Sequence, residues 1–283
     1  MEIFRTVAEL RRWSRALRCA EKDDGRVGLV PTMGALHQGH SSLIHTARAR
    51  CAHTVVSIFV NPTQFGPNED YDRYPRSFES DCALVQAGGA DAIFAPSVEE
   101  MYPPGAATFI EVAGLGDRLD GASRPGHFRG VATVVAKLLI AGEPDLAFFG
   151  QKDAAQVSIL RRMITDLRLG VELVVCPIVR EADGLALSSR NAYLIADERR
   201  QARALSRAVR WVEALAAKGE RNPEVLIDAA RQIFAAEPLI RVDYIALVDW
   251  ATLEPVEVAV PGTLFAVAAW VGTTRLIDNA ILG

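Results

Sequence analysis

The 283-residue sequence contains little that would direct it out of the cell or into a membrane. Its first 25 residues are charged throughout and include no apolar stretch followed by a small-residue cleavage site, so no export signal is visible. The longest apolar runs are short or interrupted, whereas a membrane-spanning helix needs about 20 apolar residues. We therefore expect a soluble, cytoplasmic protein with no membrane partner.

Cysteine is scarce and unpaired in the sequence. Cys19, Cys51, Cys82 and Cys176 form no C-x-x-C motif, and all four lie in apolar or amphipathic segments. A disulfide framework is unusual in a chain of this length, so these residues are predicted to be reduced, buried thiols.

An excess of positive charge is also missing. The chain has 31 Lys and Arg against 35 Asp and Glu, with a formal charge of -4 and a pI of about 5.8. This balance argues against a general polyanion-binding surface, so nucleic acid is not the expected partner. The hydrophobic fraction of 50% is enough for a sizeable core, and two domains are expected.

The order of the predicted elements indicates the fold class. After an amphipathic helix at about 6–20, strands and helices alternate. Strands are predicted at 27–30, 53–60, 91–96, 108–112, 146–150 and 171–178, and helices at 40–51, 77–89, 126–142 and 153–167. This alternation predicts an α/β fold, a Rossmann-like, doubly wound parallel sheet with ligands at the C-terminal ends of its strands.

The pattern changes after Cys176. Two successive helices are predicted at 197–219 and 222–237, followed by strands at 242–249, 263–271 and 274–282. We therefore expect two domains, a catalytic domain of residues 1–176 and a smaller α+β domain of residues 177–283.

The first polar cluster follows the strand at 27–30 and reads PTMGALHQGH, residues 31–40. Gly34 and Gly39 allow close backbone approach, and the next helix offers its N-terminal amides to an anion. His37 and His40 could both face the phosphates of a nucleotide. Two other roles are conceivable, zinc binding and helix capping. Zinc needs three or four ligands, but no H-E-x-x-H pattern occurs and the other histidines lie in different settings.

The second cluster reads FVNPTQFGPNEDYDRYPR, residues 59–76. Asn61 and Gln64 bring amides to the end of a buried strand, where they suit hydroxyls and carboxylates, although a simple turn explains them equally well. The acidic residues here and just beyond are possible Mg²⁺ ligands, although an acidic surface loop is the commoner explanation for the first three of them. They are Glu69, Asp70, Asp72 and Asp81.

Three later clusters add positive charge and hydroxyl groups. In LDGASRPGHFRG, residues 119–130, Arg124 could contact an anion or a partner subunit or be solvated, and His127 could cap the next helix. In FFGQKDAAQ (148–156) and VREADGLALSSRN (179–191), Lys152, the two serines and Arg190 suit a triphosphate. A helix start capped by Asp153 and an exposed turn are the structural alternatives for these last two.

Together these segments resemble the pantoate-β-alanine ligase family, the pantothenate synthetases of the nucleotidyltransferase superfamily. They occur in the family's order and span residues 31–194. The H-x-G-H element alone is shared by many adenylyl-transferring enzymes, but the five segments together are specific. Two positions depart from the commonest pattern, with Gln151 where glutamate is frequent and Leu187 where methionine is frequent.

The resemblance implies a two-step ligation. ATP and pantoate would give an enzyme-bound pantoyl adenylate and pyrophosphate, and the amine of β-alanine would then attack the acyl carbon to release pantothenate and AMP. Because the carboxylate of pantoate is the nucleophile, no nucleophilic side chain is needed. The resemblance also implies Mg²⁺, a homodimer, and a lid role for residues 177–283.

The resemblance assigns roles residue by residue. His40, His37, Lys152 and Arg190 would be catalytic, and we expect His40 to stabilise charge rather than to donate a proton, because an ionised carboxylate has no proton to lose. ATP would contact Met33, Gly34, Ala35, Leu36, His37, Gln38, Gly39, His40, Gly150, Gln151, Lys152, Asp153, Val179, Leu187, Ser188, Ser189 and Arg190. Pantoate and β-alanine would contact Gln64, Gln156 and Asn61, with Asp81 as the candidate metal ligand.

Two other functions are weighed against this one. The paired amides of Gln64 and Gln156 favour pantoate over another small acid activated by a related nucleotidyltransferase. The four intact catalytic candidates favour an enzyme over a nucleotide-binding module that has lost catalysis.

Overall fold

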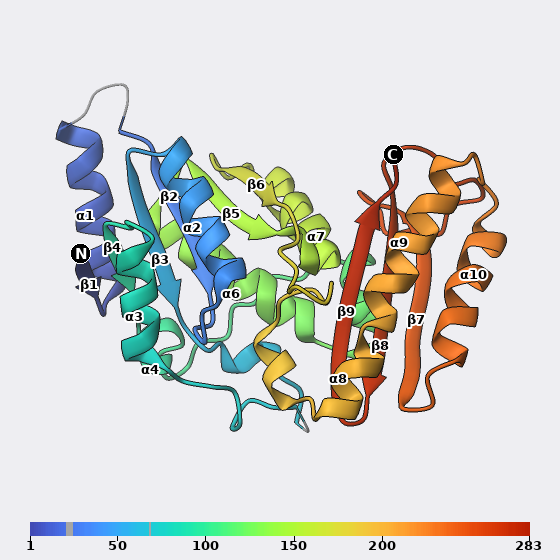
Figure 1. The fold of residues 1–283 in the computed structure, drawn as a ribbon. Helices are drawn as coiled ribbons and strands as arrows, with labels where there is room; N and C mark the ends of the chain where they lie inside the picture. The colour runs from blue at the N-terminus through green and yellow to red at the C-terminus, as the bar shows by residue number, and fades with distance from the viewer. Residues whose placement is uncertain (21–24, 68) are drawn as a thin grey trace.

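The computed structural model describes residues 1–20, 25–67 and 69–283. Its main feature is a six-stranded sheet in the order β1-β4-β3-β2-β5-β6, in which every neighbouring pair is parallel (Figure 1). The strands are β1 (Glu2–Phe4), β2 (Val27–Thr32), β3 (His53–Ile58), β4 (Ala92–Phe94), β5 (Leu146–Gly150) and β6 (Glu172–Cys176). The predicted parallel sheet is therefore confirmed.

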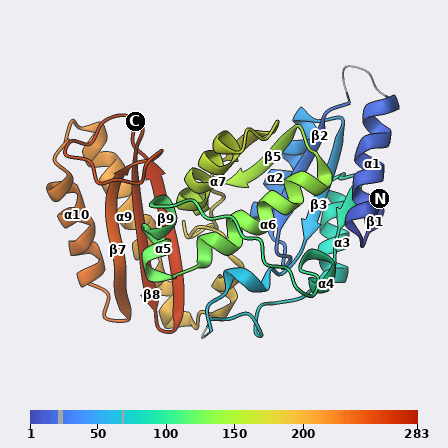
Figure 2. The same cartoon turned by 180° about the vertical axis from the view of Figure 1, so that it is seen from behind.

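Helices cover both faces of this sheet, as the predicted doubly wound fold requires. α1 (Val7–Ala20), α6 (His127–Gly142) and α7 (Ala154–Asp166) lie on one face (Figure 2). α2 (Gln38–Arg50) and α3 (Phe78–Ala87) lie on the other. Two single-turn helices, α4 (Val98–Met101) and α5 (Asp120–Ser123), occur in the connection before α6. In the described part of the chain, no helix is both long and apolar enough to cross a membrane.

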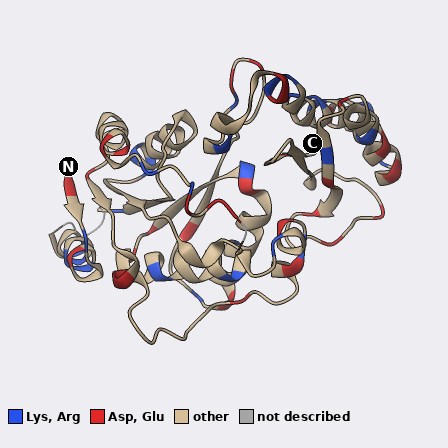
Figure 3. Cartoon of the chain, turned by 90° about the horizontal axis from the view of Figure 1, so that it is seen from below, with Lys and Arg blue, Asp and Glu red and all other residues tan. Residues whose placement is uncertain are grey.

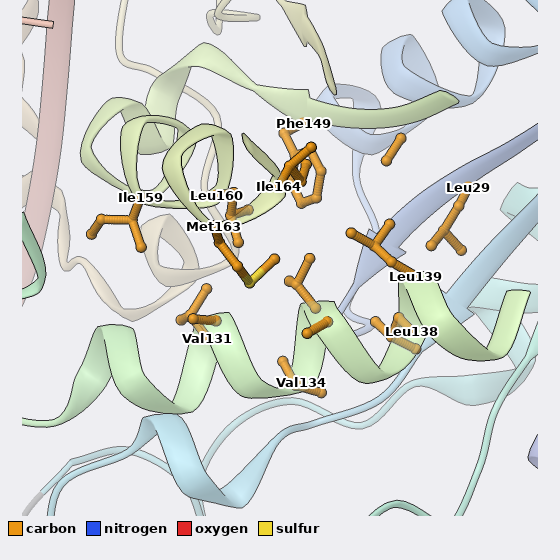
Figure 4. Packing of buried hydrophobic residues seen from close by; sticks show 14 of the residues in the cluster. Leu29, Val131, Val134, Leu138, Leu139, Phe149, Ile159, Leu160, Met163 and Ile164 are labelled. Carbon is orange, nitrogen blue, oxygen red and sulfur yellow. The ribbon is translucent and has the colours of Figure 1, made fainter. Parts of the chain in front are cut away.

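Most residues of α6 are buried, on nearly every side of the helix. Val131, Val134 and Leu138 of α6 belong to the same buried cluster as Leu160 and Met163 of α7 (Figure 4). Each of these side chains is almost fully buried, and such burial stabilises the fold by about 1.5–3 kcal/mol per side chain.

The last hundred residues form a second, smaller sheet with its own helices. α8 (Ala196–Ala202), α9 (Ala204–Ala217) and α10 (Pro223–Ala235) precede an antiparallel sheet of β7 (Ile240–Asp249), β8 (Thr263–Val271) and β9 (Thr274–Ile281). One face of this sheet packs under α9 and α10, and the other joins the hydrophobic cluster of α6 and α7. The α+β character of this region is confirmed, while the boundary after Cys176 stays a prediction.

The structure differs from the sequence-based prediction at three places. Residues 108–112 are not a strand, because the amide of Ile110 donates to Thr133 Oγ1 on α6 at 2.9 Å instead of to a neighbouring strand. The predicted helix at 197–219 is two helices that meet at Arg203. The edge strand β1 was not predicted, because three residues are too few to show a period.

The predicted burial of the cysteines is only partly correct. All four cysteines are free thiols, but only Cys51 and Cys176 are buried, while Cys19 is exposed and Cys82 is half-buried. Cys19 lies in the last turn of α1, on the solvent side.

Basic and acidic residues are interspersed over both parts of the molecule (Figure 3).

The contact between α6 and the loop after β3 gives a prediction about stability. Gly130 of α6 lies so close to this loop that an added Cβ would overlap the carbonyl group of Thr63. Glycine to alanine normally stabilises a helix by about 1 kcal/mol. Here Gly130→Ala should instead lower the free energy of unfolding by about 1–3 kcal/mol, measured by urea denaturation.

Gly116→Ala is the matched control, because a Cβ at Gly116 meets no atom within 4 Å. It should change the free energy of unfolding by no more than about 0.5 kcal/mol. Equal stability of the Gly130→Ala variant and the unmodified protein would contradict the close contact.

Candidate active site

The candidate site lies where four parallel strands end. The C-terminal ends of β2, β3, β5 and β6 lie along one edge of the sheet, and a cavity of about 230 Å³ opens between the loops that follow them. Two smaller hollows of about 120 and 60 Å³ share Lys152, Asp153 and Gln156 with this cavity. Such a position is expected for the ligands of an open α/β sheet.

The structure brings most of the predicted site residues together around these three cavities. Those that line at least one of them are Met33, His37, Gly39, His40, Asn61, Gln64, Gly150, Lys152, Asp153, Gln156, Val179, Leu187, Ser188, Ser189 and Arg190. The remaining six, which line none of the three, are Gly34, Ala35, Leu36, Gln38, Asp81 and Gln151.

The two histidines of the first loop cap α2 and also line the cavity. His37 is the N-cap residue, and its Nδ1 accepts a hydrogen bond from the amide of Gly39 at 3.1 Å. Nδ1 of His40 accepts from the amide of His37 at 3.3 Å. Since each Nδ1 is an acceptor, each neutral ring carries its proton on Nε2 and can donate it to a ligand. Capping and ligand binding, weighed as alternatives above, are thus compatible.

Burial keeps these histidines uncharged. It lowers the pKa of His40 to about 3, with a further contribution from the neighbouring His37. Burial also lowers the pKa of His37, and the charge of Lys152 adds to this effect. At neutral pH both rings therefore meet a ligand as hydrogen-bond donors, and a bound anion would raise both pKa values.

Asp81, the predicted magnesium ligand, holds the backbone of the first loop. Its carboxylate, which is 2% exposed, accepts hydrogen bonds from the amides of Ala35 at 2.9 Å and Leu36 at 2.8 Å. Ser77 Oγ donates a third at 3.2 Å. Gly34 and Ala35 both have a positive φ, of 84° and 50°, so the carboxylate holds a backbone turn that is costly for an alanine. Among the described residues, no three His, Cys, Asp or Glu side chains are grouped to hold a metal ion.

The amides of Asn61 and Gln64 are oriented by a buried hydrogen-bond chain. Asn61 Oδ1 accepts from Tyr102 Oη at 2.8 Å and from Thr63 Oγ1 at 2.9 Å. Its Nδ2 donates to Gln64 Oε1 at 3.0 Å and to the carbonyl of Gly130 at 3.1 Å. The amide of Asn61 is thus fully occupied. Gln64 Nε2 donates one hydrogen to Met33 Sδ at 3.0 Å and keeps its second N–H for a ligand. Asn61, predicted to bind substrate, orients Gln64 here.

Two arginines of the site are paired with the acidic loop after β3. Asp70 accepts from Nε of Arg190 at 3.1 Å and from Nη2 at 2.9 Å. Glu69 accepts from Nε of Arg124 at 2.7 Å. Burial alone would raise the pKa of Asp70, but the hydrogen bonds and charge of Arg190 outweigh it and hold the pKa below its ordinary value. These two acidic residues therefore neutralise arginines.

His127 completes this part of the cavity. Its Nδ1 donates to the carbonyl of Gln64 at 2.8 Å, and its Nε2 lies 3.0 Å from Nη1 of Arg124. Burial, together with the charge of Arg124, lowers the pKa of His127 to about 4. This histidine supports the loop of Gln64 instead of capping a helix.

Lys152 and Gln156 come from the turn after β5 and from α7. The turn is a 3₁₀ helix over Gln151–Asp153, and Lys152 Nζ lies 3.6 Å from Asp153 Oδ1. Asp153 is the N-cap residue of α7 but makes no side-chain capping hydrogen bond, so the capping alternative does not explain it. The side chains of Lys152 and Gln156 line all three cavities.

Sequence reasoning missed the apolar wall of the cavity. Val131, Val134, Val135 and Leu138 of α6 line it together with Phe149 of β5. In a sequence, apolar residues that face a cavity cannot be told from those that face the core. The available signal was that the segment 126–142 is apolar on almost all sides, which indicates a helix with a second buried face.

Comparison with known proteins agrees with this geometry. A family model described as pantoate-β-alanine ligase matches residues 2–281. The chain is 58% identical to pantothenate synthetase of Acidobacterium capsulatum over 286 residues, which cover 98% of this chain and 96% of the other. It is 52% identical to pantothenate synthetase of Thermotoga neapolitana, with full coverage of both.

Solved structures agree as well. The crystal structure of pantothenate synthetase from Thermus thermophilus matches with a TM-score of 0.92 and 47% identity, covering 99% of each chain. Pantoate-β-alanine ligase from Francisella tularensis, crystallised with β,γ-ATP and β-alanine, matches with a TM-score of 0.79 and 32% identity, covering 99% of this chain and 97% of the other.

The hydrogen bonds of Asp81 can be tested without any ligand. Asp81→Asn replaces an acceptor oxygen by a donor that faces an amide, so the free energy of unfolding should fall by about 1–3 kcal/mol. The measurement is urea denaturation in buffer free of divalent cations. Asp72→Asn, at an exposed acidic residue, should change it by no more than about 0.5 kcal/mol. If Asp81→Asn leaves the free energy of unfolding unchanged, the carboxylate does not hold the loop.

The lowered pKa of His40 predicts how stability depends on pH. In the unfolded chain His40 binds a proton below about pH 6.5, whereas in the folded chain it stays neutral down to about pH 3. Between these two pH values the unfolded state binds more protons, so the free energy of unfolding falls as the pH falls. The contribution of one such histidine is at most about 1.4 kcal/mol per pH unit.

His40→Gln should remove this part of the slope, measured by urea denaturation between pH 7 and pH 4. Gln38→Ala, which removes no titratable group from the same loop, should keep the slope. Identical slopes for His40→Gln and the unmodified protein would contradict a neutral, buried His40.

Proposed function

The chain belongs to the pantoate-β-alanine ligase family, and we propose that the cavity at the sheet edge is where it joins pantoate to β-alanine at the expense of ATP. Pantoate and ATP give pantoyl adenylate and pyrophosphate, and β-alanine then displaces AMP. The observation that carries this assignment is that one cavity unites the phosphate-directed groups, an oriented glutamine donor and an apolar wall.

The triphosphate lies between the first loop and the two later ones. His37 and His40 offer Nε2 protons, Lys152 offers its ammonium group, and Ser188 and Ser189 offer hydroxyls. Asp70 accepts one hydrogen each from Nε and Nη2 of Arg190, so the two N–H groups of Nη1 and the second N–H of Nη2 are left for phosphate oxygens. Met33, Gly39, Gly150, Asp153, Val179 and Leu187 complete the nucleotide site, while Gly34, Ala35, Leu36, Gln38 and Gln151 shape the loops that carry it.

The first chemical step needs alignment and charge stabilisation. The carboxylate of pantoate attacks the α-phosphorus in line with the departing pyrophosphate, and negative charge builds on the phosphate oxygens. The neutral histidines stabilise this charge by donating hydrogen bonds, and their pKa values rise as it develops. No side chain has to remove a proton from the attacking group.

Pantoate lies against Gln64, Gln156 and the wall of α6. Its hydroxyl groups accept from Nε2 of Gln64 and bind the amide of Gln156, and the apolar wall receives its two methyl groups. Asn61 acts on the substrate through Gln64.

Several further assignments rest on the family. Mg²⁺, which the ATP chemistry of the family implies, would neutralise phosphate charge, and Asp153, which lines all three cavities, is the carboxylate that would hold it. The protein acts as a cytoplasmic homodimer, and residues 177–283 form a lid that contributes Ser188, Ser189 and Arg190.

The assignment is tested by measuring AMP and pyrophosphate while each substrate is omitted in turn. AMP should form in repeated turnovers only when ATP, pantoate and β-alanine are all present. Lys152→Ala should lower the rate of adenylation by about 10²–10³-fold, the usual cost of losing one charge-stabilising group. Lys218→Ala, which removes an exposed lysine that lines none of the three cavities, should stay within about twofold.

Failure to form AMP from the complete mixture would refute the reaction. Undiminished adenylation in the Lys152→Ala variant, with its fold intact by circular dichroism, would refute the role of the lysine alone.

A further inference from the structure

Strand β9 carries two adjacent buried polar residues that each bond to a different loop of the candidate site. Asp278 is 2% exposed and Asn279 is 3% exposed. β9 is the edge strand of the small sheet, and it lies on the side of that sheet that faces the parallel sheet (Figure 1). Because buried polar groups are costly without partners, what these two side chains bond to is informative.

Asn279 bonds to the turn that carries Lys152. Its Nδ2 donates to the carbonyl oxygens of Gln151 at 3.0 Å and of Lys152 at 2.9 Å. Its Oδ1 accepts from Nε2 of Gln151 at 3.2 Å. Because carbonyl oxygens can only accept, the NH₂ group of the Asn279 side chain must face the two carbonyls. In this orientation its Oδ1 accepts the third hydrogen bond, so one orientation of the side-chain amide explains all three.

Asp278 bonds to the loop that precedes Ser188. Its two oxygens accept from Nη1 and Nη2 of Arg180 at 2.6 and 2.9 Å, and Arg180 also donates to the carbonyl of Gly184 at 3.2 Å. The backbone N–H of Asn279 donates to Asp278 Oδ1 at 2.8 Å, and this hydrogen bond links the two contacts. A single strand therefore holds the backbone of both later nucleotide loops.

The turn of Lys152 needs such support. It is a 3₁₀ helix of three residues between β5 and α7, and a turn this short satisfies few of its own carbonyl groups. The lysine side chain has a long, flexible stem, so the place its ammonium group reaches depends on how well its backbone is held.

We propose that Asn279 is a positioning residue for ATP, which holds the backbone of Gln151 and Lys152 so that the lysine ammonium group reaches the phosphates. This inference rests on the proposed function, in which Lys152 binds ATP. It assigns to the small sheet a part in nucleotide binding that acts through the backbone of the turn after β5.

The test compares Michaelis constants for the separate substrates. Asn279→Ala removes the side-chain donor that holds the carbonyls of Gln151 and Lys152, and the turn relaxes. The KM for ATP should rise about 10- to 100-fold, while the KM for pantoate stays within about twofold. Asn279→Asp keeps the shape but presents an oxygen to the carbonyls, so its KM for ATP should rise at least as much. Asn279→Ser, with one donor, should be intermediate.

Leu282→Ala controls for a general loss of stability in the small domain. Leu282 is 3% exposed, packs in the second hydrophobic cluster and lines none of the three cavities. It should lower the melting temperature and leave the KM for ATP unchanged. Melting temperatures of all variants are measured beside the kinetics, at a temperature where each is folded.

The outcomes separate this inference from the assigned reaction. If the unmodified protein forms no AMP from ATP, pantoate and β-alanine, the proposed function fails. If it does form AMP, the inference is overturned by an unchanged KM for ATP in Asn279→Ala, by equal increases in all three KM values, or by an Asn279→Asp variant that keeps the KM of the unmodified protein.

Discussion

The site depends on one constraint, that the backbone polar groups of irregular loops must find hydrogen-bond partners when they are buried. A parallel sheet pairs its own backbone, but the four loops beyond its C-terminal edge do not. Buried polar side chains from elsewhere in the chain supply the partners. Asp81 pairs two amides of the first loop, His127 pairs the carbonyl of Gln64 in the loop after β3, and Asn279 pairs two carbonyls of the turn after β5.

Much of this arrangement was predictable from the sequence, and the reason is its local character. Alternation of strands and helices, and glycine-containing clusters after strands, are properties of short segments. The sequence therefore predicted the parallel sheet, and most of the predicted site residues line the cavities. The distant partners of Asp81, Asn61 and Asp70 were not, because they lie 41 to 120 positions away in the chain. A sequence shows an acidic loop; only the fold shows that two arginines meet it.

For the histidine pair, helix capping and ligand binding are alternatives in the sequence but are compatible in the structure. Helix capping uses Nδ1 of both rings and leaves Nε2 of both for the cavity. The cap therefore also selects the tautomer and orients each ring. Burial then keeps the pair neutral, which suits a task of donating hydrogen bonds to developing charge without a strong attraction for every small anion.

The helix α6 belongs to the protein core and to the cavity wall with the same side chains. Val131, Val134 and Leu138 belong to the buried cluster that includes α7, and they also bound the cavity. A smaller residue at these positions loosens the core, and a larger one takes volume from the cavity. Core stability and cavity volume therefore cannot be changed independently at these three positions.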